Sequence, residues 1–401
     1  MVLYLSGLST RRCLMQIILE PVDTLFFRDG KPFNQGEDHF ARGFFPPTPQ
    51  TFQGVVRSKV LSDRCGCFKI YGKGCLSCPH MGKCTVPEEI GGSFSGAEEG
   101  RIEIHGPYLA KKEQGNWVVL YPTPLDWMRL KEKENTPRYF CLEIRKESVN
   151  CDLRGLLFPQ PPESVSNKEF EPASGLIDEA GFLDYLIGKV EKGKVWSGKD
   201  LWDTEYRSGI GRDMSKATTK EGQLYFIKAI RLQEETGLWA KITGLKEDFL
   251  PHGFIGIGGE GRASRYIILP DTIENFAADK DIENHIDETG CFKLVLLQPA
   301  LFALGWLPDG IDQETYQGSL NGIQVRLVSA CIGKPVMIGG WDMAANCSKP
   351  LLKYVPAGSI YYFEVEKHKG GEVMKKLHGK KIGRQTRIGF GHCVVGGWEY
   401  V

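Results

Sequence analysis

The sequence predicts an α+β fold made of two ferredoxin-like (RRM-like, βαββαβ) domains, the first of them enlarged by large insertions. Two observations lead to this prediction. Each half begins with a strand-like apolar run that ends at a proline and is followed by an Asp-Gly turn. Each half also ends with a glycine-rich loop that leads into a last strand, which indicates a duplicated unit. We expect the domains to span residues 15–270 and 291–401.

Length and composition favour a folded protein with two domains. The chain has 401 residues, and its contents of 41% apolar and 25% charged residues are ordinary for a globular protein. Its 48 glycines, about 12% of the chain against a usual value of roughly 7%, predict many turns. Basic and acidic residues number 50 each. This balance argues against a protein that coats duplex DNA over its whole surface, but it allows a local basic cleft.

The sequence predicts a cytoplasmic protein without a membrane partner. No apolar run approaches the length of a membrane span. In residues 1–13 the basic side chains follow the short apolar run, which is the reverse of a secretory signal. The first clear strand-like pattern begins at about Met15. Whether residues 1–14 belong to the natural chain therefore stays open.

The first half opens with the order expected of a ferredoxin-like unit. Residues 16–21 form a short strand-like run. A helix is predicted from Pro49, because Thr48 can cap it and proline suits the first helical position. Apolar side chains then recur at helical spacing up to Leu61. Further elements are expected as follows: strands at 102–108, 117–122, 224–232, 238–242 and 266–269, and a short helix at 181–192.

The second half repeats the pattern in a shorter form. The polar, acidic stretch 271–290 is interpreted as the connection between domains. Strands are expected at 293–299, 325–332 and 359–365, with a helical turn at 371–377 and a final strand at 392–396.

Five cysteines crowd into the insertion at residues 62–90, and they predict a metal site. In a reducing compartment such crowding indicates a bound ion, and a Cys-x-x-Cys pair can present two thiolates to one tetrahedral ion. Zinc in a structural role is favoured over an iron–sulfur cluster and over free thiols. His80 is a substitute ligand. The candidate ligands are Cys65, Cys67, Cys75, Cys78 and Cys84.

The glycine-rich loop at 253–262 favours contact with phosphates. Its glycines bring backbone N–H groups close to a ligand, and Arg262 adds positive charge. The G-x-G-x-x-G spacing within it is followed by a strand, so a dinucleotide fingerprint, which needs a helix there, is excluded. A ligand-free turn is the plain alternative. A second, shorter loop at 382–391 resembles the first and favours binding to a nucleic-acid backbone.

Nuclease chemistry has weak support in the sequence. Cleavage of RNA by general acid–base catalysis requires a histidine beside a second acid, base or lysine. His39, His105, His252 and His392 are candidates, and no motif fixes a partner for any of them. We expect His392 to form hydrogen bonds or to stack, not to act in catalysis.

Five segments together resemble one known family. They are EPVDTLFFRDGKPF (20–33), PTPQTFQGVVRSKV (47–60), EYRSGIGRD with TTKEGQLY (205–225), GFIGIGGEGR (253–262), and RIGFGH with WEYV (387–401). In this order they resemble the third subunits of the Cmr complex, the type III-B CRISPR effector, within the RAMP superfamily. The resemblance spans nearly the whole chain, and the cysteine insertion departs from it.

The resemblance implies a non-catalytic RNA-binding subunit that takes part in antiviral defence. Such subunits have two ferredoxin-like folds and hold the 5′ repeat-derived tag of the CRISPR RNA at the foot of the complex. There they bridge the large cyclase-like subunit to the backbone RAMP subunit, and no small-molecule substrate is expected. The alternative is a RAMP endoribonuclease that processes precursor CRISPR RNA. A zinc-dependent scaffold without an RNA role is the third hypothesis.

The resemblance also implies contacts with RNA at particular positions. They lie in the two glycine-rich loops, on the first helix, and in the segment that precedes the strand at 224–232. The positions are Arg57, Arg207, Arg212, Gly256, Gly258, Gly259, Gly261, Arg262, Arg387, Gly389 and His392.

Overall fold

The structure of the chain is a computed structural model. It describes residues 13–28, 40–41, 43–67, 71, 75, 77–80, 82–91, 100–131, 137–146, 153, 155–189, 194–213, 215, 218–270, 273, 276–342 and 347–401. None of the helices in these ranges combines the length and the apolar character of a membrane span.

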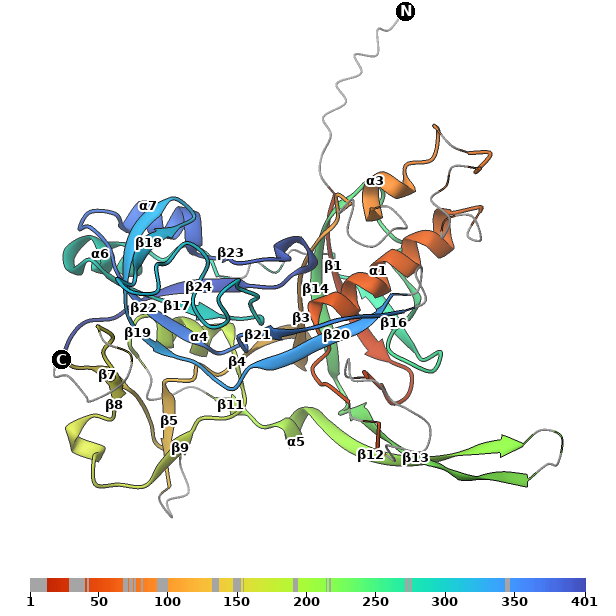
Figure 1. Ribbon diagram of the computed structural model, residues 1–401, viewed down its shortest axis with the longest axis horizontal. Coiled ribbons are helices and arrows are strands. Elements are labelled where there is room, and N and C mark those ends of the chain that lie inside the picture. Colours follow the sequence, from red (N-terminus) through yellow and green to blue (C-terminus); the bar gives the residue numbers. More distant parts are fainter. Residues whose placement is uncertain are drawn as a thin grey trace, which may run out of the picture.

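An eight-stranded sheet forms the first half of the molecule (Figure 1). At its centre β1 (Cys13–Pro21) pairs antiparallel with β14 (Thr236–Leu245) and with β16 (Ala263–Ile268). β14 also pairs antiparallel with β3 (Glu103–Glu113). The outer strands are β4 (Asn116–Pro122), β10 (Leu176–Asp178) and β11 (Val195–Trp196) beyond β3, and β15 (His252–Gly256) beyond β16.

The helix α1 (Pro49–Arg64) packs on this sheet, as predicted. The Thr48 side chain caps it by accepting a hydrogen bond of 3.3 Å from the Thr51 N–H. Phe52, Val56 and Val60 recur at helical spacing and are fully buried in the core beneath it. The sequence pattern and the cap therefore agree on where this helix begins.

A six-stranded antiparallel sheet forms the second half. β17 (Cys291–Leu296) pairs with β22 (Ile360–Glu364) and with β24 (His392–Gly397), and β22 pairs with β19 (Ile323–Cys331). The edge strands are β18 (Gln317–Leu320) and β23 (Lys380–Lys381), and helix α7 (Gly370–Leu377) joins β22 to β24.

The two sheets share one strand order, but each has only one of the two predicted crossover helices. The order β16-β1-β14-β3 corresponds strand for strand to β24-β17-β22-β19. In the first sheet α1 is present, and β15 stands where the second helix was expected. In the second sheet α7 is present, whereas the described residues between β17 and β19 form bends, bridges and strand β18.

The acidic segment 271–290, predicted as a plain connection, contains the helix α6 (Lys280–Thr289). Asp279 caps its start, and Gly290 ends it in the left-handed conformation at φ 73°. Of its residues, only Ile282 and Ile286 are buried in the core. Two apolar residues are too few to give the recurring apolar spacing that predicts a helix from sequence.

Two hairpins extend from the sheets. β12 (Trp202–Asp213) and β13 (Thr218–Leu232) form a long arm that projects from the body, whereas β20 (Val336–Asp342) and β21 (Cys347–Tyr354) reach back toward α1 (Figure 1). The remaining elements are β2 (Phe40–Ala41), α3 (Val86–Ile90), β5 (Trp127–Leu130), β6 (Tyr139–Cys141), β7 (Glu143–Ile144), β8 (Pro159–Gln160), η1 (Glu163–Val165), β9 (Phe170–Pro172), α4 (Glu179–Leu186), α5 (Gly198–Leu201) and η2 (Thr386–Ile388).

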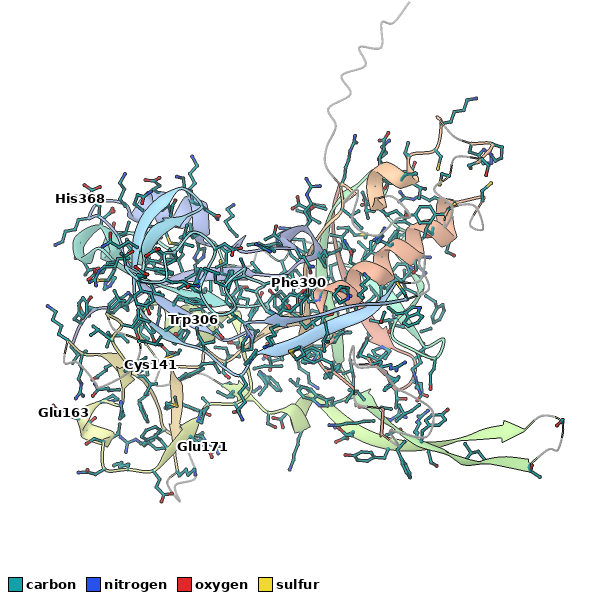
Figure 2. All side chains as sticks on the ribbon, in the orientation of Figure 1. Cys141, Glu163, Glu171, Trp306, His368 and Phe390 are labelled. Atoms are coloured by element: carbon teal, nitrogen blue, oxygen red, sulfur yellow. The ribbon has the colours of Figure 1, made fainter. Side chains whose placement is uncertain are left out.

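Hydrophobic packing joins the two halves. One core cluster contains Trp239 of the first sheet together with Phe292 of the second. Phe390, near the middle of the molecule in Figure 2, is fully buried and packs on Tyr354 with ring centroids 4.6 Å apart. Strands of the first sheet come from residues 13–268 and those of the second from 291–397. Because one hydrophobic cluster contains residues of both sheets, the packing does not divide the chain into two domains. The domain limits 15–270 and 291–401 therefore stay a prediction.

Candidate nucleic-acid interface

A pocket of about 500 Å³ lies beside the N-terminal half of α1. The first glycine-rich loop and the loop that contains Phe27 line one part of it, and the β20–β21 hairpin lines another. The structure thus brings four predicted contact residues together around one space. They are Arg57, Gly256, Gly258 and Gly259.

The first loop is the turn of the β15–β16 hairpin, so a strand follows it as predicted. Gly258 adopts φ 80°, and a Cβ there would lie 2.7 Å from the carbonyl oxygen of Phe26. The Gly259 N–H donates to that same oxygen at 2.8 Å. The Ile257 N–H donates to the Arg262 carbonyl at 3.0 Å. Because these two N–H groups bond within the protein, the loop offers fewer donors to phosphate than the sequence suggested.

Side chains give the pocket its positive charge. Arg28, Arg57 and Lys349 line it, and no carboxylate is among the described lining residues. Cations at the wall of a concave site favour an anionic ligand such as a phosphate backbone.

Aromatic side chains line the same pocket. Phe27 and Phe44 stand on the side of the first sheet, and Trp341 stands on β20. Trp341 is 53% exposed, although most tryptophans are largely buried. An exposed ring beside cations is typical of a surface on which nucleobases stack.

The β20–β21 hairpin was missed by the sequence prediction. Its position is fixed by Gln50 on α1, whose side-chain N–H donates to the Gly339 carbonyl at 3.0 Å. Trp341 and Lys349 therefore reach the pocket from the second half of the chain. The available signal was a tryptophan directly after two glycines, at positions 339–341, in a segment without apolar alternation.

Arg262 is held inside the loop and not presented to the surface. Its side chain is 13% exposed, and it donates to the Thr24 carbonyl at 2.8 Å. It also lies 3.4 Å from Glu260 and 3.7 Å from Asp23. Arg262 therefore positions the glycine-rich loop, and it would contact RNA only after it leaves these partners. Gly261, with φ 67° and open space around its Cβ position, completes the turn.

Arg207 belongs to the same ion-pair network. It lies 3.3 Å from Asp23 and 3.2 Å from Glu205, and Arg231 pairs with both of these acids. Hydrogen bonds from the Thr24 N–H and from Arg231 hold the pKa of Asp23 below its ordinary value. With Glu260 and Arg262, the network contains three acids and three arginines among the described residues, so its charges largely cancel.

The predicted contact Arg212 belongs to the projecting arm. It lies on β12, where it pairs in register with Thr219 near the end of the projecting arm (Figure 1). Its side chain is outside what the structure describes.

The second glycine-rich loop packs against the first residue of α1. Gly389 is buried at φ 121°, and a Cβ there would lie 3.0 Å from Pro49 and from two carbonyls of β3. Arg387 is exposed, and its guanidinium lies 3.4 Å from the Gly100 carbonyl. Of Arg387 and Gly389, two of the three contacts predicted at this loop, only Arg387 is exposed.

His392 is inside the molecule, and this placement argues against the predicted contact with RNA. It is 7% exposed, and its Nδ1 lies 2.6 Å from the Tyr108 hydroxyl. The ring of His105 meets it edge-on, with centroids 5.7 Å apart. Burial lowers the pKa of His392 well below its ordinary value and that of His105 to about 3. Burial also lowers the pKa of nearby Lys381 to about 8.

The five cysteines of the insertion lie near one another and are free thiols. Cys67 and Cys78 are hydrogen-bonded, and burial raises the pKa of Cys67. Burial and the neighbouring thiols raise the pKa of Cys75. In the described ranges, no three His, Cys, Asp or Glu side chains stand in positions ready to hold an ion. Closely spaced thiols are nevertheless a donor set that suits zinc.

One family model covers nearly the whole chain. The family is described as "CRISPR-associated protein (Cas_Cmr3)", and it matches residues 17–398. None of the curated proteins matches the chain.

The solved structures that match the chain include subunits of CRISPR effector complexes. A chain of the type III-B Cmr-beta complex bound to cognate target RNA has 15% identity and a TM-score of 0.44, with 86% of each chain covered. A chain of the Csm3–Csm4 subcomplex of type III-A has 12% identity and a TM-score of 0.34, with 88% of this chain and 94% of that chain covered. Likenesses at these levels do not establish a shared function.

Proposed function

The chain belongs to the Cas_Cmr3 family of CRISPR-associated proteins, and from this premise we propose that it is a non-catalytic RNA-binding subunit of a type III-B CRISPR effector. In this role it holds the 5′ repeat-derived tag of the CRISPR RNA in the cytoplasm. It bridges the large cyclase-like subunit and the backbone RAMP subunit. Family membership and the segments quoted above support this assignment.

The observation that carries the RNA-binding role is the composition of the pocket beside α1. Arg28, Arg57 and Lys349 supply positive charge, and Trp341 supplies an exposed ring. Cations that pair with phosphates and rings that stack on splayed bases are the two components of single-stranded RNA recognition. Duplex RNA is read mostly by shape, so this combination favours a single-stranded tag.

The placement of the histidines supports a non-catalytic role. His105 and His392 are adjacent, but burial lowers the pKa of both rings and so disfavours the imidazolium form that a general acid needs near neutral pH. His392 is also bonded to Tyr108 and does not line the pocket. His39 lies outside the described residues.

The fold proposal accompanies the function. We infer that the two large sheets are two ferredoxin-like units, each of which has lost one crossover helix. The shared strand order supports this inference, as does the presence of α1 in one unit and α7 in the other.

Binding of RNA to pocket variants tests the proposal. With an oligonucleotide that carries the 5′ tag, Trp341→Ala is expected to lower affinity by about 5- to 150-fold, because stacking contributes roughly 1–3 kcal/mol per base. Trp341→Phe keeps a ring face and should restore most of the affinity. Lys367→Ala, an exposed lysine before α7, is the control and should bind as the wild type does.

Two results would overturn the assignment. Equal binding of the wild type and Trp341→Ala would remove the pocket from the interface. Cleavage of repeat RNA by the wild type, lost in His39→Ala, would favour the endoribonuclease. If the purified chain retains no small RNA of defined 5′ sequence and binds none, the result favours the hypothesis of a zinc-dependent scaffold without an RNA role.

A further inference from the structure

The cysteine-rich insertion begins where α1 ends. Cys65 is the C-terminal cap of the helix, and its N–H donates to the Leu61 carbonyl at 3.0 Å. One residue earlier, Arg64 lies 2.8 Å from the fully buried carboxylate of Glu89 on α3. Glu89 also accepts a bond of 3.0 Å from the Lys246 N–H, just beyond β14. The thiols therefore lie at a junction of α1, α3 and the first sheet.

Two tight turns deliver the other thiols to this junction. In the first, the Cys78 N–H donates to the Cys75 carbonyl at 3.0 Å, and Cys75 adopts φ 59°. In the second, the Cys84 N–H donates to the His80 carbonyl at 3.0 Å. A turn that separates two cysteines by two residues is the usual way in which a protein presents two thiolates to one ion.

The thiols gather around Cys75. Its carbonyl accepts the Cys78 N–H, so these two residues belong to one turn. Cys65, Cys75 and Cys84 also pack against the same hydrophobic cluster beneath α1. This shared, half-buried surface selects Cys65, Cys75 and Cys84, and the turn that joins Cys78 to Cys75 adds the fourth ligand. Cys67 is hydrogen-bonded to Cys78, but it neither packs on that cluster nor belongs to that turn.

We propose that Cys65, Cys75, Cys78 and Cys84 bind one zinc ion in a structural site that fastens the end of α1 to the segment before α3. Binding removes four protons from four thiols and transfers no electron. The side chains must move from their described positions to ligate the ion. Four thiolates complete a tetrahedron, so the site has no open position for catalysis. Cys67 and His80 remain beside it as non-ligands, and the site does not depend on RNA binding.

Metal analysis of the full chain, purified without a metal-affinity tag or chelator, tests the proposal. We expect about one zinc per chain. Cys75→Ser and Cys78→Ser should lose it. Cys347→Ser, which changes an exposed cysteine of β21, is the matched control and should keep it. Iron in place of zinc, or no bound metal, would overturn the proposal.

Alkylation of the wild-type chain identifies the ligands without any variant that could misfold. Before chelation, Cys65, Cys75, Cys78 and Cys84 should resist iodoacetamide, whereas Cys347 reacts. After chelation all five should react, as read by mass spectrometry of peptides. Protection of Cys67 in place of Cys84, or equal reactivity of the four thiols and Cys347 before chelation, contradicts the ligand assignment.

Discussion

Gly258 is the residue of the first loop that a side chain can least replace. Its φ of 80° lies in the left-handed region, and a Cβ would lie 2.7 Å from a backbone oxygen of Phe26. Gly261 shares the left-handed conformation at φ 67°, but nothing lies within 4 Å of its Cβ position. A comparison of substitutions at the two glycines therefore distinguishes the free-energy cost of the left-handed conformation from that of steric contact with Phe26.

Gly258→Ala is expected to destabilise the chain by about 2–3 kcal/mol, because it adds a backbone clash to the strained conformation. Gly261→Ala should cost only about 1 kcal/mol, from conformation alone. Urea unfolding of both variants measures the difference. Equal losses of stability in the two variants would mean that the segment containing Phe26 shifts to accommodate a methyl group at no cost in free energy.

At the residue scale, the sequence predicted where the glycine-rich loop lies and where α1 begins. The Thr48–Pro49 cap and the glycine run at 253–262 are local signals. The cap is confirmed, whereas the predicted loop is confirmed only after Gly256, because Gly253 to Gly256 lie in the edge strand β15. Which arginines are accessible is not a local property. Arg262 is occupied by Thr24 and Asp23, more than 230 positions away in the chain, so its predicted contact with RNA could not be judged without the fold.

At the element scale, the ion pairs around Asp23 hold three pieces of chain together. Arg207 on β12 and Arg231 on β13 meet Asp23, and Arg262 of the glycine-rich loop approaches the same carboxylate. The arm formed by these two strands is thereby joined to the edge of the pocket loop. Because the arginines are neutralised by acids, removal of one acid should free positive charge for a polyanion.

Asp23→Asn is therefore expected to strengthen binding to heparin and to single-stranded RNA, with a steeper dependence of affinity on salt. Glu288→Gln changes an exposed acid of α6 by the same charge and is the control. Salt-dependent binding isotherms give both the affinity and the slope. If the two variants behave alike, the gain reflects net charge and not the freed arginines.

Three of the elements that the sequence did not predict, α6, β20 and β21, bury only one or two apolar side chains each. α6 has two apolar anchors, and β21 is mostly exposed and contains Pro350. β20 and β21 contact α1 through the Gln50–Gly339 hydrogen bond, and of their described residues only Ile338 and Tyr354 are buried, in a small cluster with Phe390. Without apolar alternation there is no periodic signal, so the hairpin that completes the pocket was missed.

At the scale of the whole molecule, the two halves meet across a buried polar joint. Tyr108 and His105 of β3 face His392 of β24, and the Gln298 side chain donates to the Pro107 carbonyl at 2.8 Å. A duplicated unit was predicted because each half carries its own strand and loop signals, and the two sheets share one strand order. The buried polar joint was not predicted, because it depends on how one sheet packs against the other.

This joint should make stability depend on pH. Burial lowers the pKa of His105 to about 3 and that of His392 well below 6.5, so the unfolded chain binds more protons than the folded chain as pH falls below 6.5. The positive charges of Lys241, Lys380 and Lys381 lower the pKa of His105 further. The stabilisation is complete above pH 6.5 and is lost as pH decreases, by about 1.4 kcal/mol per pH unit for each histidine.

Urea unfolding of the wild type and of His105→Gln between pH 7.5 and 5 measures this dependence. We expect His105→Gln to flatten the slope below pH 6.5 by about one proton equivalent, because glutamine cannot take up the proton. His368→Gln changes an exposed histidine (labelled in Figure 2) and should leave the slope as in the wild type. An unchanged slope in His105→Gln would mean that His105 takes up its proton equally in the folded and the unfolded chain, which contradicts a pKa lowered by burial in the joint.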